Sequence, residues 1–243
     1  MEWQDFARGA LDLFFPANCS ICGLPLESLN RSFICWNCWQ KVEWVPFPVC
    51  IRCGKPLGVD CQGENFSPIC SSCQKFPPGF KRLFTPTFYR GVMVEAIRLF
   101  KYKSMRGISR GFNFILDSYF KKVDFISLGI ELVVPVPLHP KRKRERGFNQ
   151  AEDIARIVAR HLKVKVGNYL ARVRYTLPQT NLDKQDRRKN LTDAFVLRKK
   201  IEGKTVLLVD DVYTTGATLN EASSTIKQAK AEVFAFALAR TPD

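Results

Sequence analysis

Cysteines at short, regular spacing are the most prominent chemical feature of the sequence. Eight of the nine cysteines form four Cys-x-x-Cys pairs, which begin at Cys19, Cys35, Cys50 and Cys70, and Cys61 is left over. A Cys-x-x-Cys turn presents two thiolates to one ion, and a second turn 12 or 16 residues farther along completes a tetrahedral Zn²⁺ site. Disulfide bonds are the alternative, but the chain has no secretion signal, and cytosolic thiols stay reduced.

The cysteine pairs belong to an internal repeat. The segment CSICGLPL, which begins at Cys19, has a counterpart, CIRCGKPL, which begins at Cys50. The repeat favours sites built from neighbouring pairs, so we expect two structural zinc sites. Their ligands would be Cys19, Cys22, Cys35 and Cys38 in one site, and Cys50, Cys53, Cys70 and Cys73 in the other. Cys61 has no role in this arrangement, and zinc would supply folding energy to a region with few other core residues.

A second chemical feature is a pair of adjacent carboxylates, Asp210 and Asp211, which follow the apolar segment Val206–Val209. A turn rich in Thr and Gly comes next, and a helix is predicted after it. Backbone N–H groups at the start of a helix bind anions, and threonine hydroxyls add hydrogen bonds to phosphate oxygens. The residues of the turn are Val212, Tyr213, Thr214, Thr215, Gly216, Ala217 and Thr218. The pattern predicts a site for a sugar that carries a phosphate, and it lacks the Gly-Lys-Ser/Thr end of a Walker A loop.

Charge divides the chain into two parts. The net charge of the whole chain is +15, and the sum over residues 1–75 is −1, which leaves +16 for residues 76–243. Such asymmetry predicts two modules, which we place at 1–78 and 79–243 with Pro77-Pro78-Gly79 as the linker. The basic second module is suited to an anionic partner, either nucleic acid or a small molecule rich in phosphate.

Strands and helices alternate in the basic module. The expected strands are Leu83–Tyr89, Leu132–Leu138, Val206–Val209 and Val233–Ala239. The expected helices are Val92–Tyr102, Phe112–Phe120, Gln150–Leu162 and Ala217–Lys230. This alternation predicts an α/β fold with a mostly parallel sheet and helices on both faces. Ligands of such sheets bind beyond the carboxyl ends of the strands, which is where Asp210 and Asp211 stand.

The apolar residues predict a folded core and no membrane insertion. They make up 46% of the chain, which is enough to bury a sizeable core. The longest apolar runs, such as Val233–Ala239, are far shorter than the roughly 18 residues of a membrane helix. The N-terminus is acidic and lacks the apolar centre of a signal peptide. A cytoplasmic protein is therefore expected.

The segment VLLVDDVYTTGAT, over 206–218, looks like the phosphoribosyl pyrophosphate (PRPP) loop of type I phosphoribosyltransferases. Together with the cysteine pairs in front of it, the whole chain resembles the ComF family of competence-associated proteins. Further matching segments are Phe100–Lys103, Val134–Leu138, Arg144–Ala151 and Pro178–Leu182, with Arg188 and Asn190. The resemblance implies a small double zinc-ribbon module, with four cysteines at each zinc, followed by a Rossmann-like phosphoribosyltransferase type I domain.

The resemblance also implies roles for single residues. Asp210 and Asp211 would be the catalytic pair, which binds the ribose 2′- and 3′-hydroxyls, with Asp211 shared with Mg²⁺. The turn from Val212 to Thr218 would hold the 5′-phosphate. The residues implied for the pyrophosphate are Pro137, Leu138, His139 and the basic residues that follow, with Arg188 from a loop over 172–190 that closes over the ligand.

Thr214 departs from the pattern of purine-base transferases, which often carry an Asp at this position as a general base. A threonine cannot take a proton at neutral pH. Either the nucleophile needs no deprotonation, as for an amine, or no transfer takes place.

A basic run, KRKRER over 141–146, is an unusually long insert in the loop implied for pyrophosphate. It could be a solvated charge run, it could surround pyrophosphate, or it could contact nucleic acid. Five cations exceed the need of one pyrophosphate, which favours a polyanion, and the lack of a base-reading motif favours single-stranded DNA. The residues predicted to contact nucleic acid are Lys141, Arg142, Lys143, Arg144, Arg146, Arg187 and Lys189. Three tryptophans of the first module, Trp36, Trp39 and Trp44, could stack on bases or pack around the metal sites.

Three functions stay open at this point. The first is a ComF-like protein of DNA uptake and natural transformation that binds PRPP and single-stranded DNA and works with other proteins of the competence machinery. The second is an active transferase that moves phosphoribose from PRPP to an unidentified nucleophile of the amine type. The third is a non-catalytic sensor of PRPP. The fold alone does not choose among them.

Overall fold

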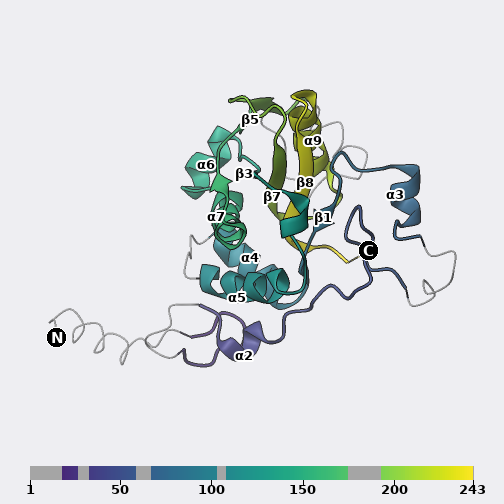
Figure 1. Cartoon of the computed structure of the whole chain (residues 1–243). Helices are drawn as coiled ribbons and strands as arrows, with labels where there is room; N and C mark the ends of the chain where they lie inside the picture. Colours follow the sequence, from purple (N-terminus) through teal and green to yellow (C-terminus); the bar gives the residue numbers. More distant parts are fainter. Residues whose placement is uncertain (1–17, 27–32, 59–66, 103–107, 175–192, 243) are drawn as a thin grey trace.

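The computed structural model describes residues 18–26, 33–58, 67–102, 108–174 and 193–242, and its centre is a parallel sheet (Figure 1). The strands of this sheet lie in the order β1-β8-β7-β3-β4, and β2 also pairs with β8. Their bounds are Leu83–Phe84 for β1, Thr87–Phe88 for β2, Leu132–Pro135 for β3, Lys165–Val166 for β4, Thr205–Tyr213 for β7 and Glu232–Arg240 for β8. The predicted α/β class with a mostly parallel sheet is confirmed.

Strand β7 stands between β3 and β8, and its continuous apolar run, Val206–Val209, is buried, as expected of a strand covered on both faces. In its register, Val209 lies opposite Pro135 of β3, and Asp210 lies opposite Ala237 of β8. The carboxyl ends of β3 and β7 therefore meet at one edge of the sheet, with the two aspartates at that edge.

Helices cover both faces of the sheet. Leu207 and Val209 of β7 pack in a core with α4, α5 and α7, whereas Val206 and Leu208 pack in a second core with α9. The bounds of these helices are Val92–Tyr102 for α4, Ser109–Phe120 for α5, Gln150–Leu162 for α7 and Ala217–Gln228 for α9. The start of α7 is fixed by Asn149, whose side chain accepts a hydrogen bond from the Ala151 N–H at 3.2 Å.

Several predicted elements have different bounds. The strand expected over 83–89 is interrupted at Pro86 and forms β1 and β2. The strand expected over 132–138 ends at Pro135, since Pro137 has no N–H for a ladder. In contrast, β7 continues past Val209 to Tyr213, because β8 pairs with it over this whole length. The first helical residue of α5 is Ser109, and α9 ends at Gln228.

The basic insert, which the sequence led us to treat as part of a loop, is instead a short helix, α6 (Pro140–Arg146). Proline is favoured at the first helical position, His139 caps the start, and Gly147 ends the helix with φ 78°. A second pair of strands, β5 (Leu170–Arg172) and β6 (Phe195–Leu197), is antiparallel and was also not predicted.

The cysteine repeat folds as two similar ribbons. In the first, the Cys19 N–H donates to the Leu24 carbonyl at 2.8 Å, and in the second the Cys50 N–H donates to the Lys55 carbonyl at 2.7 Å. Each ribbon has a short helix after its third cysteine, α2 (Trp36–Trp39) or α3 (Ser71–Lys75). Figure 1 shows α2 beside α5 and α3 on the side of β1. The predicted pair of cysteine ribbons before the sheet is confirmed.

The tryptophans of the first ribbon serve mainly as packing residues. Trp39 is buried, and its ring lies against Phe112 of α5 at 5.9 Å between centroids. Gly111 of α5 has no side chain at this contact, and a Cβ there would lie 2.1 Å from the Trp39 ring. Trp44 is partly buried against the same core, and only Trp36 exposes half of its surface.

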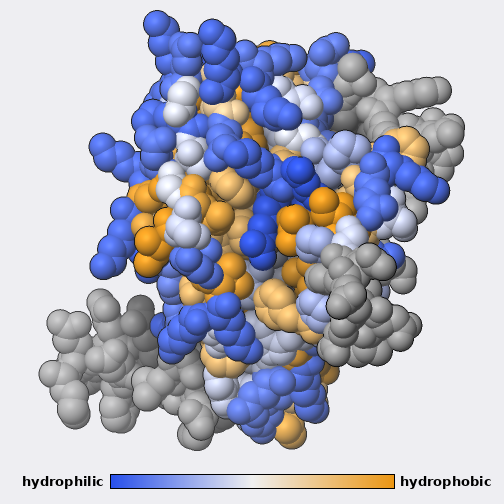
Figure 2. Space-filling view, turned by 45° about the vertical axis from the view of Figure 1, so that its right-hand side comes forward, coloured by the Kyte–Doolittle hydropathy of each residue, from blue (hydrophilic) through white to orange (hydrophobic). Residues whose placement is uncertain are grey.

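Hydrophilic side chains cover most of the described surface in the view of Figure 2. Figure 2 shows one face, on which hydrophobic residues reach the surface in separate groups among hydrophilic ones. In the part of the chain that the structure describes, none of the helices is both long and apolar enough to cross a membrane.

Candidate functional site

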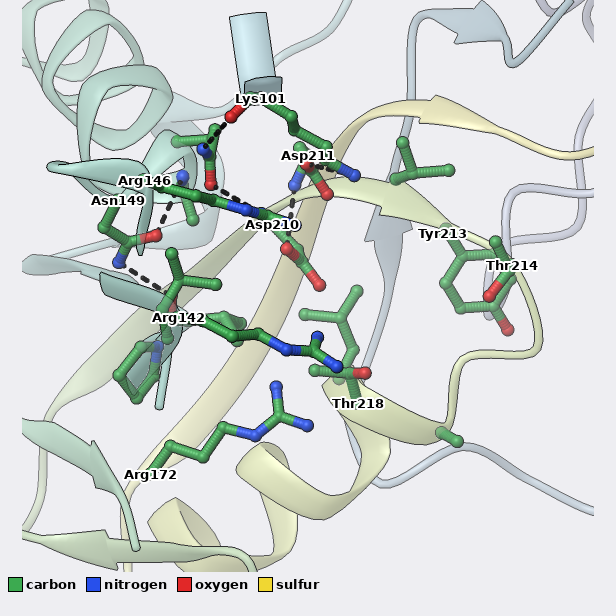
Figure 3. Close-up of a pocket in the computed structure, with 18 of the residues that line it drawn as sticks. Lys101, Arg142, Arg146, Asn149, Arg172, Asp210, Asp211, Tyr213, Thr214 and Thr218 are labelled. Carbon is green, nitrogen blue, oxygen red and sulfur yellow. Dashed lines mark hydrogen bonds and ion pairs between the residues drawn. The ribbon is translucent and has the colours of Figure 1, made fainter. Parts of the chain in front are cut away.

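A cavity of about 500 Å³ opens at the carboxyl ends of β3 and β7. Its walls come from the end of α4, from α6, from the start of α7, from β5 and from the turn before α9 (Figure 3). The lining residues include Lys101, Pro137, Leu138, Arg142, Arg146, Asn149, Gln150, Arg172, Asp210, Asp211, Val212, Tyr213, Thr214, Gly216, Ala217 and Thr218. This volume and this position at a sheet edge are typical of a small-molecule site.

Asp211 forms an ion pair with Lys101, the last-turn lysine of α4, at 2.7 Å. The side chains of Lys101 and Asp211 are only 21% and 13% exposed. Burial alone would lower the pKa of Lys101, but the charge and hydrogen bond of Asp211 outweigh it, so that this pKa is raised. Lys101 therefore stays protonated and holds one of the two carboxylates in an ion pair.

Asp210 lies beside Asp211 and accepts a hydrogen bond from the Asp211 backbone N–H at 2.9 Å. Burial, followed by the charge of Asp211, raises the pKa of Asp210 to about 7. Its protonation therefore changes near neutral pH, and an approaching cation or hydroxyl group would favour the charged form.

Two guanidinium groups face the carboxylates from the opposite side of the cavity. Figure 3 shows Arg142 of α6 and Arg172 of β5 extending toward Thr218. Burial and the nearby charge of Arg142 lower the pKa of Arg172 to about 10, while Asp210 acts in the opposite direction. Two neighbouring guanidinium groups, one of them buried, are suited to an anionic ligand with more than one charge.

A chain of hydrogen bonds ties α6 and α7 to α4. Arg146 donates to the Gln150 side chain at 3.1 Å, and Gln150 donates to the Lys101 carbonyl at 3.5 Å. Asn149 donates to the Val136 carbonyl at 3.0 Å, which fixes the start of α7 against the end of β3. The cations of α4 and α6 are thereby held on one rim of the cavity.

The predicted phosphate turn lies at the start of α9, and Arg142 and Arg172 extend toward its Thr218 (Figure 3). Gly216 has φ 76°, which favours glycine, and a Cβ there would lie 2.7 Å from the Tyr213 ring. Thr214 and Thr218 line the cavity. Thr215 is not among the described lining residues, and its hydroxyl instead accepts from the Ala217 N–H at 3.5 Å.

The basic insert is divided by its helical form. Arg142 and Arg146 stand one turn apart and line the cavity, half-buried, whereas Lys141, Lys143 and Arg144 are exposed. His139 is not among the described lining residues, and its Nδ1 accepts from the Lys141 N–H at 3.2 Å. The predicted site residues outside the described residues are Arg187, Arg188 and Lys189, and Cys61 also lies outside them.

Sequence reasoning did not find the parts of the site that come from α4 and α7. Lys101 lies in the segment FKYK, which was noted only for its resemblance, and Asn149 and Gln150 lie in another such segment. Arg172 was named as part of a loop, and it stands on β5. One signal was available in the sequence. The segments Phe100–Lys103 and Arg144–Ala151, which both resemble the family, carry polar residues next to the end of one predicted helix and the start of another.

The cysteines form the two predicted clusters. In each, the four sulfur atoms lie within 4.8 Å of one another. The Sγ–Sγ distances include 3.8 Å for Cys19–Cys38 and 3.7 Å for Cys53–Cys70. Zn–S bonds of about 2.3 Å in a tetrahedron require sulfur atoms roughly 3.8 Å apart.

Backbone amides support the same interpretation of the clusters. The Cys35 N–H donates to Cys19 Sγ, and the Cys70 N–H donates to Cys50 Sγ, both at 3.3 Å. Such bonds favour the thiolate form that zinc requires. Both sets of four cysteines therefore fit structural zinc.

Comparisons with known proteins agree with this division of the chain. Residues 10–75 match the family described as double zinc ribbon domain, and residues 149–241 match the phosphoribosyl transferase domain family. The chain is 30% identical to competence protein F of Haemophilus influenzae over 88% of this chain and 93% of that protein. It is 30% identical to the DNA utilization protein YhgH of Salmonella typhi, over 94% and 99% of the two chains. It is 28% identical to competence protein ComFC of Bacillus subtilis, over 86% and 84%.

We predict about two zinc ions per chain by elemental analysis, because each ribbon supplies a complete ligand set. Cys35→Ser should reduce the content to about one ion, and Cys61→Ser should leave it unchanged. Protein that contains no zinc when purified without chelators, with its cysteines in disulfide bonds, would contradict this prediction.

We predict that Asp210→Asn stabilises the free protein above neutral pH. A folded pKa near 7, above the ordinary value of 3.8, means that the folded state binds the extra proton between these pH values. The unfolding free energy of the parent should therefore fall as pH rises through this window, and Asn removes that loss. We expect a gain of about 1–3 kcal/mol at pH 8 and none near pH 4, measured by denaturant titration.

Glu131→Gln is the control with the opposite sign. The Thr205 N–H donates to this exposed carboxylate at 2.9 Å and lowers the pKa of Glu131. Its stabilising effect is present above its ordinary pKa and is lost in acid. Equal stability changes for both variants at pH 8 would contradict the raised pKa of Asp210.

Proposed function

The chain belongs to the ComF family of competence proteins, and from this premise we propose that it acts in DNA uptake by binding PRPP and single-stranded DNA. The observation that carries the proposal is the cavity at the end of β7. Its two carboxylates suit the ribose hydroxyls, and the same cavity is lined by the phosphate turn and by Arg142 and Arg172. We retain the division at residues 78 and 79 and a cytoplasmic location, with competence proteins as partners, as parts of the same proposal.

PRPP carries a phosphate at one end of its ribose and a pyrophosphate at the other, and the cavity offers binding groups for both and for the ribose between them. The turn at Gly216 and Thr218 would bind the 5′-phosphate, as the N-termini of helices do. Arg142 and Arg172 would bind the pyrophosphate. Asp210 and Asp211 would hold the ribose hydroxyls together with Mg²⁺, which would neutralise charge on the pyrophosphate oxygens. Lys101 would leave Asp211 when the metal and the sugar arrive.

Single-stranded DNA would bind to the outer face of α6. Lys141, Lys143 and Arg144 are exposed there, next to the cavity but turned away from it. Arg187 and Lys189, which lie outside the described residues, are retained as further predicted contacts to the DNA. Phosphate contacts of this kind position a strand without reading its bases.

Transfer of phosphoribose is the second candidate function, and the position of Arg142 and Arg172 favours it. Cations at the pyrophosphate would stabilise the leaving group in an oxocarbenium-like transition state. Thr214 offers no general base, so the acceptor would be an amine whose lone pair is available. Release of pyrophosphate in the presence of candidate amines separates this function from a PRPP sensor, which would bind PRPP without consuming it.

We predict that the double variant Asp210→Ala/Asp211→Ala loses detectable binding of Mg-PRPP in calorimetry. Both acceptors for the ribose hydroxyls and the metal ligands are removed. Arg142→Ala should weaken binding roughly tenfold or more, since a charge-assisted hydrogen bond contributes about 1.5–3 kcal/mol.

The control for this experiment is Glu202→Ala, which removes an exposed carboxylate that is 3.9 Å from Lys230. It should bind Mg-PRPP like the parent. The proposal is wrong if the parent protein shows no affinity for Mg-PRPP, or if the double aspartate variant binds as well as the parent.

We predict that replacing Lys141, Lys143 and Arg144 by Ala weakens single-stranded DNA binding similarly across sequences. The log–log salt slope should become less negative by about 2, because each lost phosphate contact contributes roughly 0.7. The matched variant Arg142→Ala/Arg146→Ala, on the inner face of the same helix, should change PRPP binding more than DNA binding. An unchanged slope in the triple variant would identify the outer face of α6 as a solvated surface only.

A further inference from the structure

The second cysteine cluster packs directly against the phosphate turn. Tyr213 is the last residue of β7 and belongs to this turn, and its side chain packs against the cluster of four cysteines in the second ribbon. All four of these cysteines are buried, whereas Cys22 of the first cluster is exposed. Tyr213 of the basic module thus helps to cover the second cluster, together with Leu57 and Ile69 of the ribbon itself.

Arg240, at the end of β8, contacts both the second ribbon and Tyr213. Its guanidinium donates to the Cys53 carbonyl at 3.0 Å and lies over the Tyr213 ring at 5.9 Å. The Thr241 N–H donates to the Tyr213 carbonyl at 3.0 Å. Arg240 is 3% exposed, so this arrangement is part of the interior.

The second ribbon is also held at its first turn. The Leu83 N–H of β1 donates to the Arg52 carbonyl at 2.8 Å. A Cβ on Gly54 would lie 3.0 Å from Thr85 and 3.3 Å from the Leu83 carbonyl, so the backbones of ribbon and sheet are in close contact. A change in the conformation of the turn that carries Cys50 and Cys53 would therefore disturb its contacts with both Tyr213 and the sheet.

Tyr213 carries this contact into the cavity. The ring edge and hydroxyl of Tyr213 lie 2.7 Å from the place that a Cβ of Gly216 would occupy. Gly216 is the left-handed residue from which α9 begins, and Tyr213 and Gly216 both line the cavity. The Tyr213 ring thus lies between the second cysteine cluster and Gly216 of the phosphate turn.

We propose that the second zinc site positions the phosphate turn through Tyr213, so that metal at this site, and not at the first, is coupled to ligand binding. The inference rests on the proposed function, since the ligand is PRPP. The first ribbon serves as an internal control, because its Trp39 packs on α5. Tyr213 is a positioning residue in this arrangement.

Thermodynamic linkage makes the coupling reciprocal. If zinc in the second site increases the affinity for PRPP, then PRPP must increase the affinity of that site for zinc by the same factor. This gives two readouts, one on the phosphate ligand and one on the metal.

The repeat supplies matched variants for the test. Cys35→Ser and Cys70→Ser replace equivalent ligands of the first and second sites, and each should retain about one zinc ion. In calorimetry with Mg-PRPP, Cys70→Ser should lose at least about tenfold in affinity, within the range of roughly 5- to 150-fold typical of coupled sites. Cys35→Ser should bind like the parent. Equal losses in both variants would overturn the coupling.

Tyr213 variants test the coupling with all zinc ligands present. Tyr213→Ala should speed the chelator-driven release of one of the two zinc ions and weaken PRPP binding, and Tyr213→Phe, which retains the ring, should do neither. Saturating Mg-PRPP should slow release of that same ion in the parent and in Cys35→Ser.

Two outcomes separate failure of the inference from failure of the proposed function. A parent protein that binds no Mg-PRPP would overturn the proposed function. Release of zinc from Tyr213→Ala at the parental rate would overturn the positioning role, whether or not PRPP binds.

Discussion

The close approach of two carboxylates at the buried end of β7 is the constraint on which the rest of the cavity depends. Burial disfavours the charged form of Asp210, and the neighbouring charge of Asp211 adds to this cost. Cations from three separate elements offset this cost. Among them, Lys101 forms an ion pair with Asp211 at 2.7 Å, and Arg172 lies near Asp210. A site balanced in this way favours a ligand that brings both metal and phosphate, because the cations can then turn from the carboxylates to the phosphates.

Local patterns predicted the parts of the site that are continuous in sequence. The apolar segment of β7, the two aspartates and the glycine turn follow one another, and the cysteine ligands come in pairs, so spacing alone identified them. Lys101 could not be found in this way, because its partner Asp211 is brought to it only by packing of α4 against the sheet. The basic run was predicted as a loop because a helix of seven mostly charged residues is too short to show the periodic apolar pattern by which helices are recognised.

The helical form of the basic run changes how its charges are understood. Five cations looked excessive for one pyrophosphate, and the structure assigns them to two faces of α6. Arg142 and Arg146 belong to the cavity, and the exposed cations stand outside it. One short helix thus places a site for a small phosphate ligand next to a surface suited to a polyanion. The two proposed ligands, PRPP and single-stranded DNA, would therefore bind on adjacent faces of α6.

The presence of phosphate-binding groups beside the carboxylates can be tested directly by ³¹P nuclear magnetic resonance of Mg-PRPP during titration with the protein. Binding in the cavity as described here would shift or broaden the resonances of the 5′-phosphate and of both pyrophosphate phosphorus atoms together, and Asp210→Ala/Asp211→Ala would abolish all three effects. Perturbation of the pyrophosphate resonances alone, with the same result in the double variant, would show that the ligand binds only to surface cations and would contradict a site organised around Asp210 and Asp211.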